Sequence, residues 1–128
     1  MKMTPEQLQN ELAYYTGTEA YHKFSITRDV CTDGVLFLAK EAGAFWLLEQ
    51  IVLKLREESY VEKDYFAVVN VKVEDNKARI QFEDGDEHVF AVVYVDYTDF
   101  PLPECKLFAI WQEETKPGSW LLLLPSEY

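Results

Sequence analysis

The chain has few of the residues that mark disulfide-rich proteins and nucleotide-binding enzymes. It contains only 2 cysteines among 128 residues, Cys31 and Cys105. Two cysteines are too few for the disulfide framework of a small secreted domain, so we expect both thiols to be reduced. The 5 glycines are isolated from one another, and no Gly-x-Ser-x-Gly motif occurs. These absences argue against nucleotide hydrolysis and serine-hydrolase chemistry.

Positive charge and long apolar runs are also scarce. The 12 Lys and Arg residues are outnumbered by 23 Asp and Glu residues, which gives a net charge of −11. This balance disfavours binding to nucleic acids or to anionic membrane surfaces. The first residues lack the apolar run of a signal peptide, and Glu49 and Gln50 interrupt the longest apolar stretches. We therefore expect a cytoplasmic protein with no nucleic-acid or membrane partner.

Residues with metal-binding or nucleophilic side chains do not form a known motif. The soft metal ligands are His22, Cys31, His88 and Cys105, and none has Cys-x-x-Cys or His-x-x-x-His spacing. Cys31 precedes a predicted helix, whose N-terminus can lower a thiol pKa, which makes it the better candidate nucleophile. The simpler interpretation of both cysteines is a small packed apolar residue. We expect no metal, no cofactor and no enzymatic activity.

The hydrophobic content indicates one globular domain. Hydrophobic residues make up 48% of the chain and aromatic residues 15%, enough to form a core at this length. We expect a single α+β domain over residues 1–128, with a helical part at 1–64 and a sheet part at 65–128. A capping-box pattern at Thr4 predicts a helix that ends near Thr16. Further helices are predicted from Thr32 or Asp33 to residue 42 and over 44–56, the latter facing the sheet through Phe45, Leu48, Val52 and Leu55.

The hydrophobic period changes from about 3.6 to 2 after residue 64, which predicts strands. Short polar turns separate five candidate strands at 65–74, 78–83, 87–95, 104–112 and 119–124. No helix-length segment lies between them, so the connections favour hairpins. The predicted fold is α+β, with the N-terminal helices packed on a five-stranded antiparallel meander sheet.

Aromatic residues supply one candidate binding site. A pocket between helix and sheet could bind a small molecule, and interfaces are enriched in such side chains. The alternative interpretation is that these rings fill the core. The candidate pocket or interface residues are Trp46, Trp111, Trp120 and Tyr94.

Acidic residues supply a second candidate surface. Successive turns of a meander alternate between the two ends of the sheet, so two acidic turns are expected at one end. One interpretation is solvated hairpin tips. The other is an anionic surface for a basic partner, including a DNA-mimic or anti-defence role. The residues are Glu83, Asp84, Asp86, Glu87, Glu113 and Glu114.

Two predicted strands are apolar on both faces, at residues 90–95 and 120–124. A bare apolar face must be covered, either by a second copy of the chain or by the N-terminal connection. The first solution predicts a homodimer that persists or tightens as salt rises, because its contacts would be apolar.

Three segments resemble a family of short bacterial proteins of unknown function that occur in some mobile-element neighbourhoods. They are Thr32-Asp33-Gly34-Val35 leading into Ala39-Lys40-Glu41-Ala42-Gly43-Ala44-Phe45-Trp46-Leu47-Leu48, then Thr98-Asp99-Phe100-Pro101-Leu102, and the terminal Leu122-Leu123-Leu124-Pro125-Ser126-Glu127-Tyr128. The resemblance implies no established activity, cofactor or catalytic residue. We expect a non-catalytic module that acts through protein–protein association, with small-molecule binding or acidic DNA mimicry as alternatives.

Overall fold

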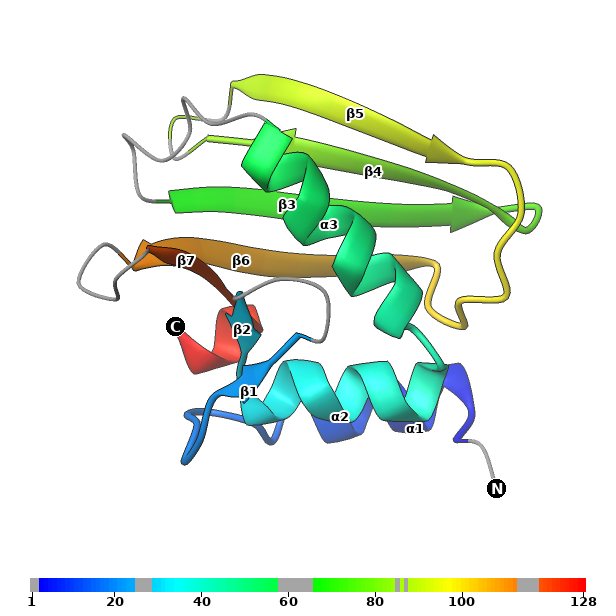
Figure 1. The fold of residues 1–128 in the computed structure, drawn as a ribbon. Helices are drawn as coiled ribbons and strands as arrows, with labels where there is room; N and C mark the ends of the chain where they lie inside the picture. Colours follow the sequence, from blue (N-terminus) through cyan, green and yellow to red (C-terminus); the bar gives the residue numbers. More distant parts are fainter. Residues whose placement is uncertain (1–2, 25–28, 58–65, 85, 87, 113–117) are drawn as a thin grey trace.

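The structure is a computed structural model that describes residues 3–24, 29–57, 66–84, 86, 88–112 and 118–128. Three α-helices and a seven-stranded sheet make up the described part of the chain (Figure 1). The helices are α1 (Pro5–Leu12), α2 (Asp33–Ala42) and α3 (Phe45–Glu57), and a 3-10 turn, η2, spans Pro125–Glu127. The strands are β1 (His22–Lys23), β2 (Val30–Cys31), β3 (Phe66–Glu74), β4 (Lys77–Glu83), β5 (Val89–Val95), β6 (Glu104–Gln112) and β7 (Ser119–Leu123).

The start of α1 follows the predicted capping box. The Thr4 side chain accepts a hydrogen bond from the N–H of Gln7, and the Gln7 side chain accepts one from the N–H of Thr4. The helix ends at Leu12, one turn before the predicted end near Thr16. Helix α1 contacts α2, and its buried residues, Leu8 and Leu12, make it a short amphipathic cover.

The ends of α2 and the position of α3 also follow local signals. Thr32 caps α2 by accepting a hydrogen bond from the N–H of Val35, and Gly43 ends it with a left-handed φ of 61°. Helix α3 buries a stripe against the sheet that includes the predicted Leu48, Val52 and Leu55. The prediction for Phe45 was wrong, because its side chain is 43% exposed at the first turn of α3.

A buried ion pair fixes the last turn of α3 to the sheet. Asp29 is fully buried, and its carboxylate accepts two hydrogen bonds of 2.7 Å from the guanidinium of Arg56. The same carboxylate accepts the N–H of Trp120 at 2.8 Å, near the start of the buried strand β7. One side chain thus joins α3 and β7 just before β2 begins.

The sheet differs from the predicted five-stranded antiparallel meander. Its order is β1-β2-β7-β6-β3-β4-β5, and β2 runs parallel to β7 while the other neighbours are antiparallel. The five predicted strands exist, with ends within two residues of those expected. The meander fails at one connection, because residues 96–103 carry the chain from the outer strand β5 across to the far side of β3. Thr98, Phe100 and Leu102 of this connection are buried, so the segment packs into the protein instead of forming a solvated polar turn.

The two additional strands, β1 and β2, have two residues each. Such short strands cannot display a period of 2, and pairing with β7 rather than local pattern makes them extended. They extend the sheet towards α2, where the first two helices lie below β7 (Figure 1).

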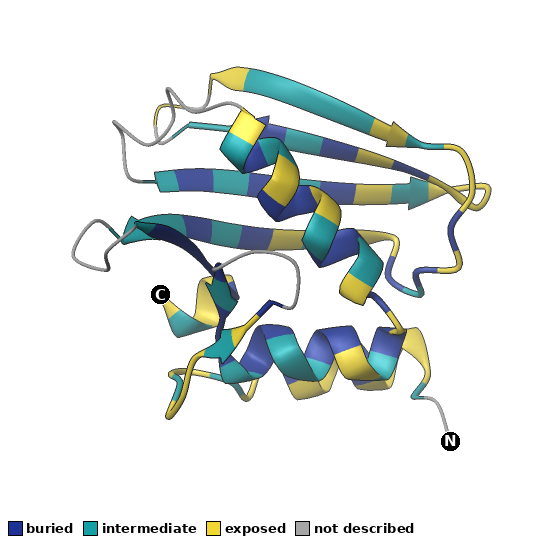
Figure 2. Cartoon of the chain, in the orientation of Figure 1, coloured by how far each residue is buried: buried dark blue, intermediate teal, exposed yellow. Residues whose placement is uncertain are grey.

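The two faces of the sheet have different coverings. Helix α3 crosses one face, over the alternating buried positions of β3, β4 and β6 (Figures 1 and 2). The opposite face, here called the outer face, carries residues such as Phe66, Asn70 and Lys106. At one end of this face Tyr128 contacts Phe66 and Phe108 at ring-centroid distances of 5.7 and 5.4 Å. The other end is polar, and it borders the site described next.

The two strands predicted to be apolar on both faces are buried to different extents. Residues 120–124 are all buried within the chain. In β5 five of the seven residues are half-buried and two are exposed. Of the two strands, only β5 therefore has apolar side chains that a second copy of the chain could cover.

Candidate functional site

The predicted aromatic residues lie in three separate places. Trp120 is fully buried and its ring contacts Trp111 at a centroid distance of 5.4 Å. Trp46 is half-buried on α3, whereas Tyr94 is 71% exposed on the outer face. None of the four lines either of the two cavities described below.

The described members of the predicted acidic surface have local structural partners. Glu83 accepts a hydrogen bond from the side-chain amide of Asn70. Asp84 accepts the N–H groups of Asp86 at 2.8 Å and His88 at 3.0 Å. These backbone bonds, chiefly that from His88, hold the pKa of Asp84 below its ordinary value. Asp86 is exposed, and Glu87, Glu113 and Glu114 lie outside the described residues.

A cavity of about 760 Å³ lies beside the first half of β6. Its walls come from three parts of the chain: α1 with Ala13, the segment from Pro103 to Lys106, and the segment from Leu124 to Ser126. Residues 70–72 of β3 complete the lining. We call this cavity the β6 groove.

The β6 groove exists because β7 covers only half of β6. Strand β3 pairs with β6 from Glu104 to Ile110, but β7 pairs with it only from Phe108 to Gln112. After Leu123 the chain turns away into η2 instead of continuing along β6. One edge of β6 therefore has no strand beside residues 104–107 in the described part of the chain.

Two residues of this open edge direct their backbone groups into the groove. The carbonyl of Pro103 accepts the N–H of Val73 at 2.8 Å, so Pro103 faces β3. Because successive residues of a strand face opposite edges, Cys105 and Leu107 also face β3, while Glu104 and Lys106 face away from it. The N–H and C=O groups of Glu104 and Lys106 have no hydrogen-bond partner among the described residues.

Three cations border the β6 groove on the outer face. The register places Lys106, Asn70 and Gln81 in one cross-strand row, and Glu104, Lys72, Arg79 and Tyr94 in the next. A second cavity of about 300 Å³ lies over these rows and shares Asn70, Lys72, Glu104 and Lys106 with the groove. We call Lys72, Arg79 and Lys106 the cationic patch.

The cationic patch has no ion-pair partner in the described part of the chain. All three side chains are exposed, and no carboxylate of a described residue lies within ion-pair distance of them. Two carboxylates lie near the patch: Glu104 stands in the second row, and Glu83 accepts a hydrogen bond from Asn70 in the first. A local excess of positive charge in a chain of net charge −11 favours an anionic ligand at this position.

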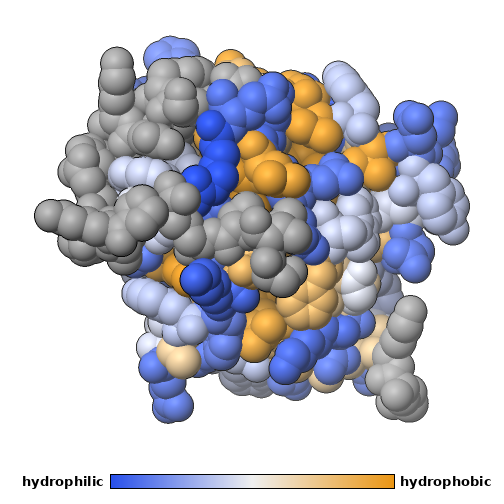
Figure 3. All heavy atoms as spheres, in the orientation of Figure 1, coloured by the Kyte–Doolittle hydropathy of each residue, from blue (hydrophilic) through white to orange (hydrophobic). Residues whose placement is uncertain are grey.

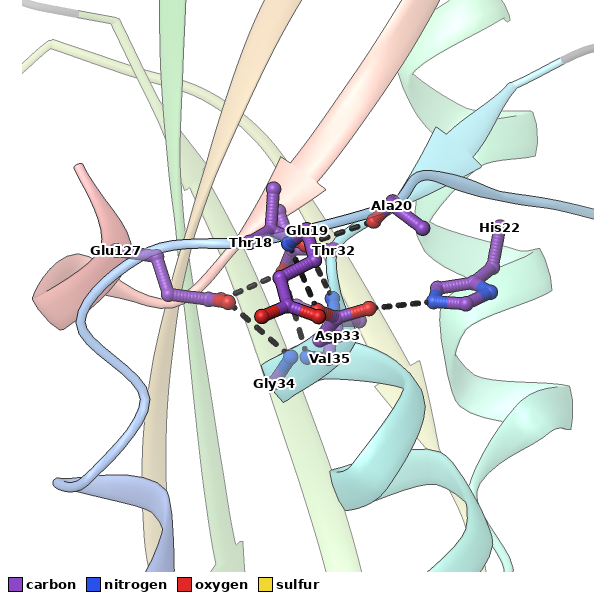
Figure 4. A network of polar contacts seen from close by, with 9 residues as sticks. All are labelled: Thr18, Glu19, Ala20, His22, Thr32, Asp33, Gly34, Val35 and Glu127. Carbon is purple, nitrogen blue, oxygen red and sulfur yellow. Dashed lines mark hydrogen bonds and ion pairs between the residues drawn. The ribbon is translucent and has the colours of Figure 1, made fainter.

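A polar network holds the far wall of the groove in place (Figure 4). The Glu127 carboxylate accepts the hydroxyl of Thr32 at 2.5 Å, the N–H of Gly34 at 3.1 Å and the N–H of Leu124 at 3.0 Å. An anion at the first turn of α2 is stabilised by the positive end of the helix dipole. The Ser126 hydroxyl also donates to the carbonyl of Tyr15 at 2.6 Å. These contacts fix the segment Leu124–Ser126 opposite β6.

Gly34 is required where the C-terminal segment meets α2. A Cβ atom at this position would lie 2.6 Å from Cδ1 of Leu124 and 2.8 Å from Oε1 of Glu127. The absence of a side chain thus permits the close approach of Glu127. Two of the segments that carry the family resemblance, around Thr32 and at the C-terminus, meet at this contact.

The other half of the network surrounds Asp33 (Figure 4). Its carboxylate accepts the N–H of Glu19 at 2.9 Å and lies 2.7 Å from Nε2 of His22, and its own N–H donates to Thr18. The hydrogen bond from the Glu19 backbone, followed by the contact with His22, holds the pKa of Asp33 below its ordinary value. The network orders residues 18–22 against α2.

The two thiols are poor nucleophiles. Burial raises the pKa of Cys31 and of Cys105 to about 12. The negative charges of Glu127 and Asp33 contribute to this shift in the pKa of Cys31. At neutral pH both side chains are therefore thiols, although Cys105 lines the groove.

The sequence contained part of the signal for this site. Lys72, Arg79 and Lys106 all fall at the polar positions of predicted strands, so their exposure could be read from the alternation. Their proximity could not, because it requires β6 beside β3. Glu127 had little local signal, since Thr32 and Gly34 lie more than 90 residues away and only Leu124 is close in sequence.

Neither a membrane-spanning helix nor a metal-binding cluster is found in the described part of the chain. No curated protein and no solved structure matches the chain. A family model does match it, over residues 6–128, which is nearly its whole length. The chain therefore belongs to the family of unknown function DUF6876.

Proposed function

We propose that this protein binds an extended segment of a partner protein, which adds a strand to the open edge of β6. The single observation that carries the proposal is the open edge itself. The unpartnered backbone groups of Glu104 and Lys106 line a cavity of about 760 Å³. Strand addition of this kind obtains affinity from main-chain hydrogen bonds and specificity from pockets for alternate side chains.

The size of the groove fits a short peptide segment. Ligand-binding cavities commonly span about 300–1,000 Å³. The open edge covers residues 104–107, which at about 3.3 Å per residue corresponds to a bound segment of roughly five residues with its flanks.

The chemistry of the two sides predicts the sequence of that segment. Side chains of an added strand alternate between the two faces of the sheet. On one side they would meet Leu12 and Leu124, which favour apolar residues. On the outer face they would approach the cationic patch, which favours Asp or Glu. We therefore propose a partner segment in which acidic and apolar residues alternate.

The raised pKa values of the thiols are consistent with binding rather than catalysis at this groove. Cys105 is the one described thiol in its lining, and it is protonated at neutral pH. We propose a non-catalytic role for the site on this basis.

A defined peptide pair tests the proposal. One probe is a blocked five-residue peptide that alternates Val and Glu, and the other alternates Val and Lys. Isothermal titration at low ionic strength should detect the acidic peptide and not the basic one. Lys106→Glu should weaken binding by at least about tenfold, since it reverses a charge beside the groove.

The matched control is Lys40→Glu, the same charge reversal at an exposed position on α2 away from the groove. It should leave the affinity within about twofold of the unmodified chain. Equal weakening by both variants would show that only net charge matters. Equal affinity for both peptides, or none for either, would contradict the proposal.

A further inference from the structure

We propose that β5 is a self-association surface, at which two copies of this chain pair edge to edge about a two-fold axis near Val93. Strand β5 forms one edge of the sheet and pairs only with β4 among the described residues. Its seven residues carry no charge, although the chain has a net charge of −11. Edge strands with these properties offer unpaired backbone groups to a second strand.

The outward backbone groups of β5 belong to Val92 and Tyr94. The hydrogen bond from Val73 to Pro103 shows that the backbone groups of Val73 point towards β6. Along a strand these groups point to the two edges alternately, so the registers of β3 with β4 and of β4 with β5 give their direction in every residue of β5. Ala91, Val93 and Val95 then face β4. At the far end of the ladder, the N–H of Asp84 donates to the carbonyl of His88 at 3.0 Å, in agreement with the same alternation.

The regular part of β5 is self-complementary. A shift in register between Phe82 and Glu83 leaves residues 91–95 as the regular segment of the strand. Antiparallel pairing about Val93 places Val92 opposite Tyr94 of the second copy, and Ala91 opposite Val95 of the second copy. Pairs of aromatic and β-branched residues stabilise antiparallel strands, and no like charges meet.

The surface next to this edge is apolar. Leu53 of α3 is 49% exposed, and Ala91 and Val93 are only half-buried beneath the helix. The space-filling view shows hydrophobic side chains gathered between α3 and β5 (Figure 3). A second copy would cover this region and bring its own apolar strip, whereas a charged partner would find no counter-charge on the strand.

A small interface of this kind predicts a reversible dimer with a Kd in the micromolar range. Sedimentation equilibrium should show a shift from the 15.0 kDa mass of one chain to twice that mass as concentration rises. The dimer should persist at high salt, since charge repulsion is screened beyond about 8 Å at physiological ionic strength.

A matched pair of tyrosine substitutions locates the interface. Tyr94→Lys introduces a charge opposite Val92 of the second copy and should raise the dimer Kd at least about tenfold. Tyr14→Lys makes the same change at a position that is 79% exposed and lies beyond the end of α1. It should leave the dimer Kd unchanged.

A cysteine pair tests the register. Val93→Cys places two thiols opposite each other, at the Cα separation of about 4.5 Å that a non-hydrogen-bonded pair has and a disulfide accepts. Mild oxidation should cross-link this variant. Val92→Cys places its thiols two residues out of register, about 8 Å apart, and should not cross-link.

A 15.0 kDa species at every concentration and ionic strength would overturn the proposal. So would a dimer that responds equally to Tyr94→Lys and Tyr14→Lys, or one that cross-links through Val92→Cys. The surface does not include the β6 groove, so failure of peptide binding would leave this result unaffected.

Discussion

Removal of the Glu127 side chain should loosen the C-terminal segment and weaken the fold. Glu127→Ala leaves the Thr32 hydroxyl and the N–H of Gly34 without their acceptor and takes a negative charge from the first turn of α2. Loss of a helix-capping side chain costs about 0.5–2 kcal/mol, and loss of the helix-dipole interaction about 0.3–1 kcal/mol. Because Glu127 is partly exposed, we expect a total of about 2 kcal/mol.

Urea unfolding followed by circular dichroism measures this change. With a slope near 2 kcal/mol per M, the midpoint should fall by about 1 M at an unchanged slope. Glu127→Gln keeps the shape and one acceptor oxygen and should lose about half as much. Glu74→Ala is the control, since it removes an exposed glutamate at the end of β3.

The same substitution tests the link between the network and the groove. Glu127 does not line the groove, but it holds the wall formed by Leu124–Ser126. Glu127→Ala should therefore weaken binding of the Val–Glu peptide without removing any lining side chain. Equal midpoints for Glu127→Ala and Glu74→Ala would refute the assigned role of the network.

Three further predictions follow from single residues. Leu48→Ala should cost about 2–5 kcal/mol of unfolding free energy because the side chain is fully buried, whereas Leu53→Ala on the same helix should cost less than about 1 kcal/mol, as measured by urea unfolding. The pKa of Asp33 is depressed below 3.8 in the folded state, so its contribution to stability is present above that pH and disappears as the pH falls through the folded pKa; the midpoint difference between the unmodified chain and Asp33→Asn should therefore shrink in acid. Cys31 and Cys105 should react slowly with a thiol reagent in the folded chain and rapidly in urea, and fast labelling of Cys31 at neutral pH would contradict its raised pKa.

The strand and helix positions were predictable because each signal is local. A period of 2 over seven to nine residues marks β3, β4 and β6, and caps at Thr4, Thr32 and Gly43 mark helix ends. Local signals of this kind do not depend on which elements become neighbours.

Strand order was not predictable in the same way. The meander failed because Phe100 and Leu102 are buried in a connection that resembles an ordinary proline-rich linker. Strand β2 was not predicted because only its parallel pairing with β7 makes it extended. The groove could not be predicted either, since its position depends on where β7 leaves β6.

The most direct test of the binding site is hydrogen exchange at single amides, measured by NMR with and without the Val–Glu peptide. The amides of Cys105 and Leu107 face β3 and should exchange slowly in both states. The amide of Lys106 faces the groove, so it should exchange rapidly in the free chain and become protected when the peptide is bound. A Lys106 amide that is already protected in the free chain, or that stays unprotected at saturation, would contradict strand addition at β6.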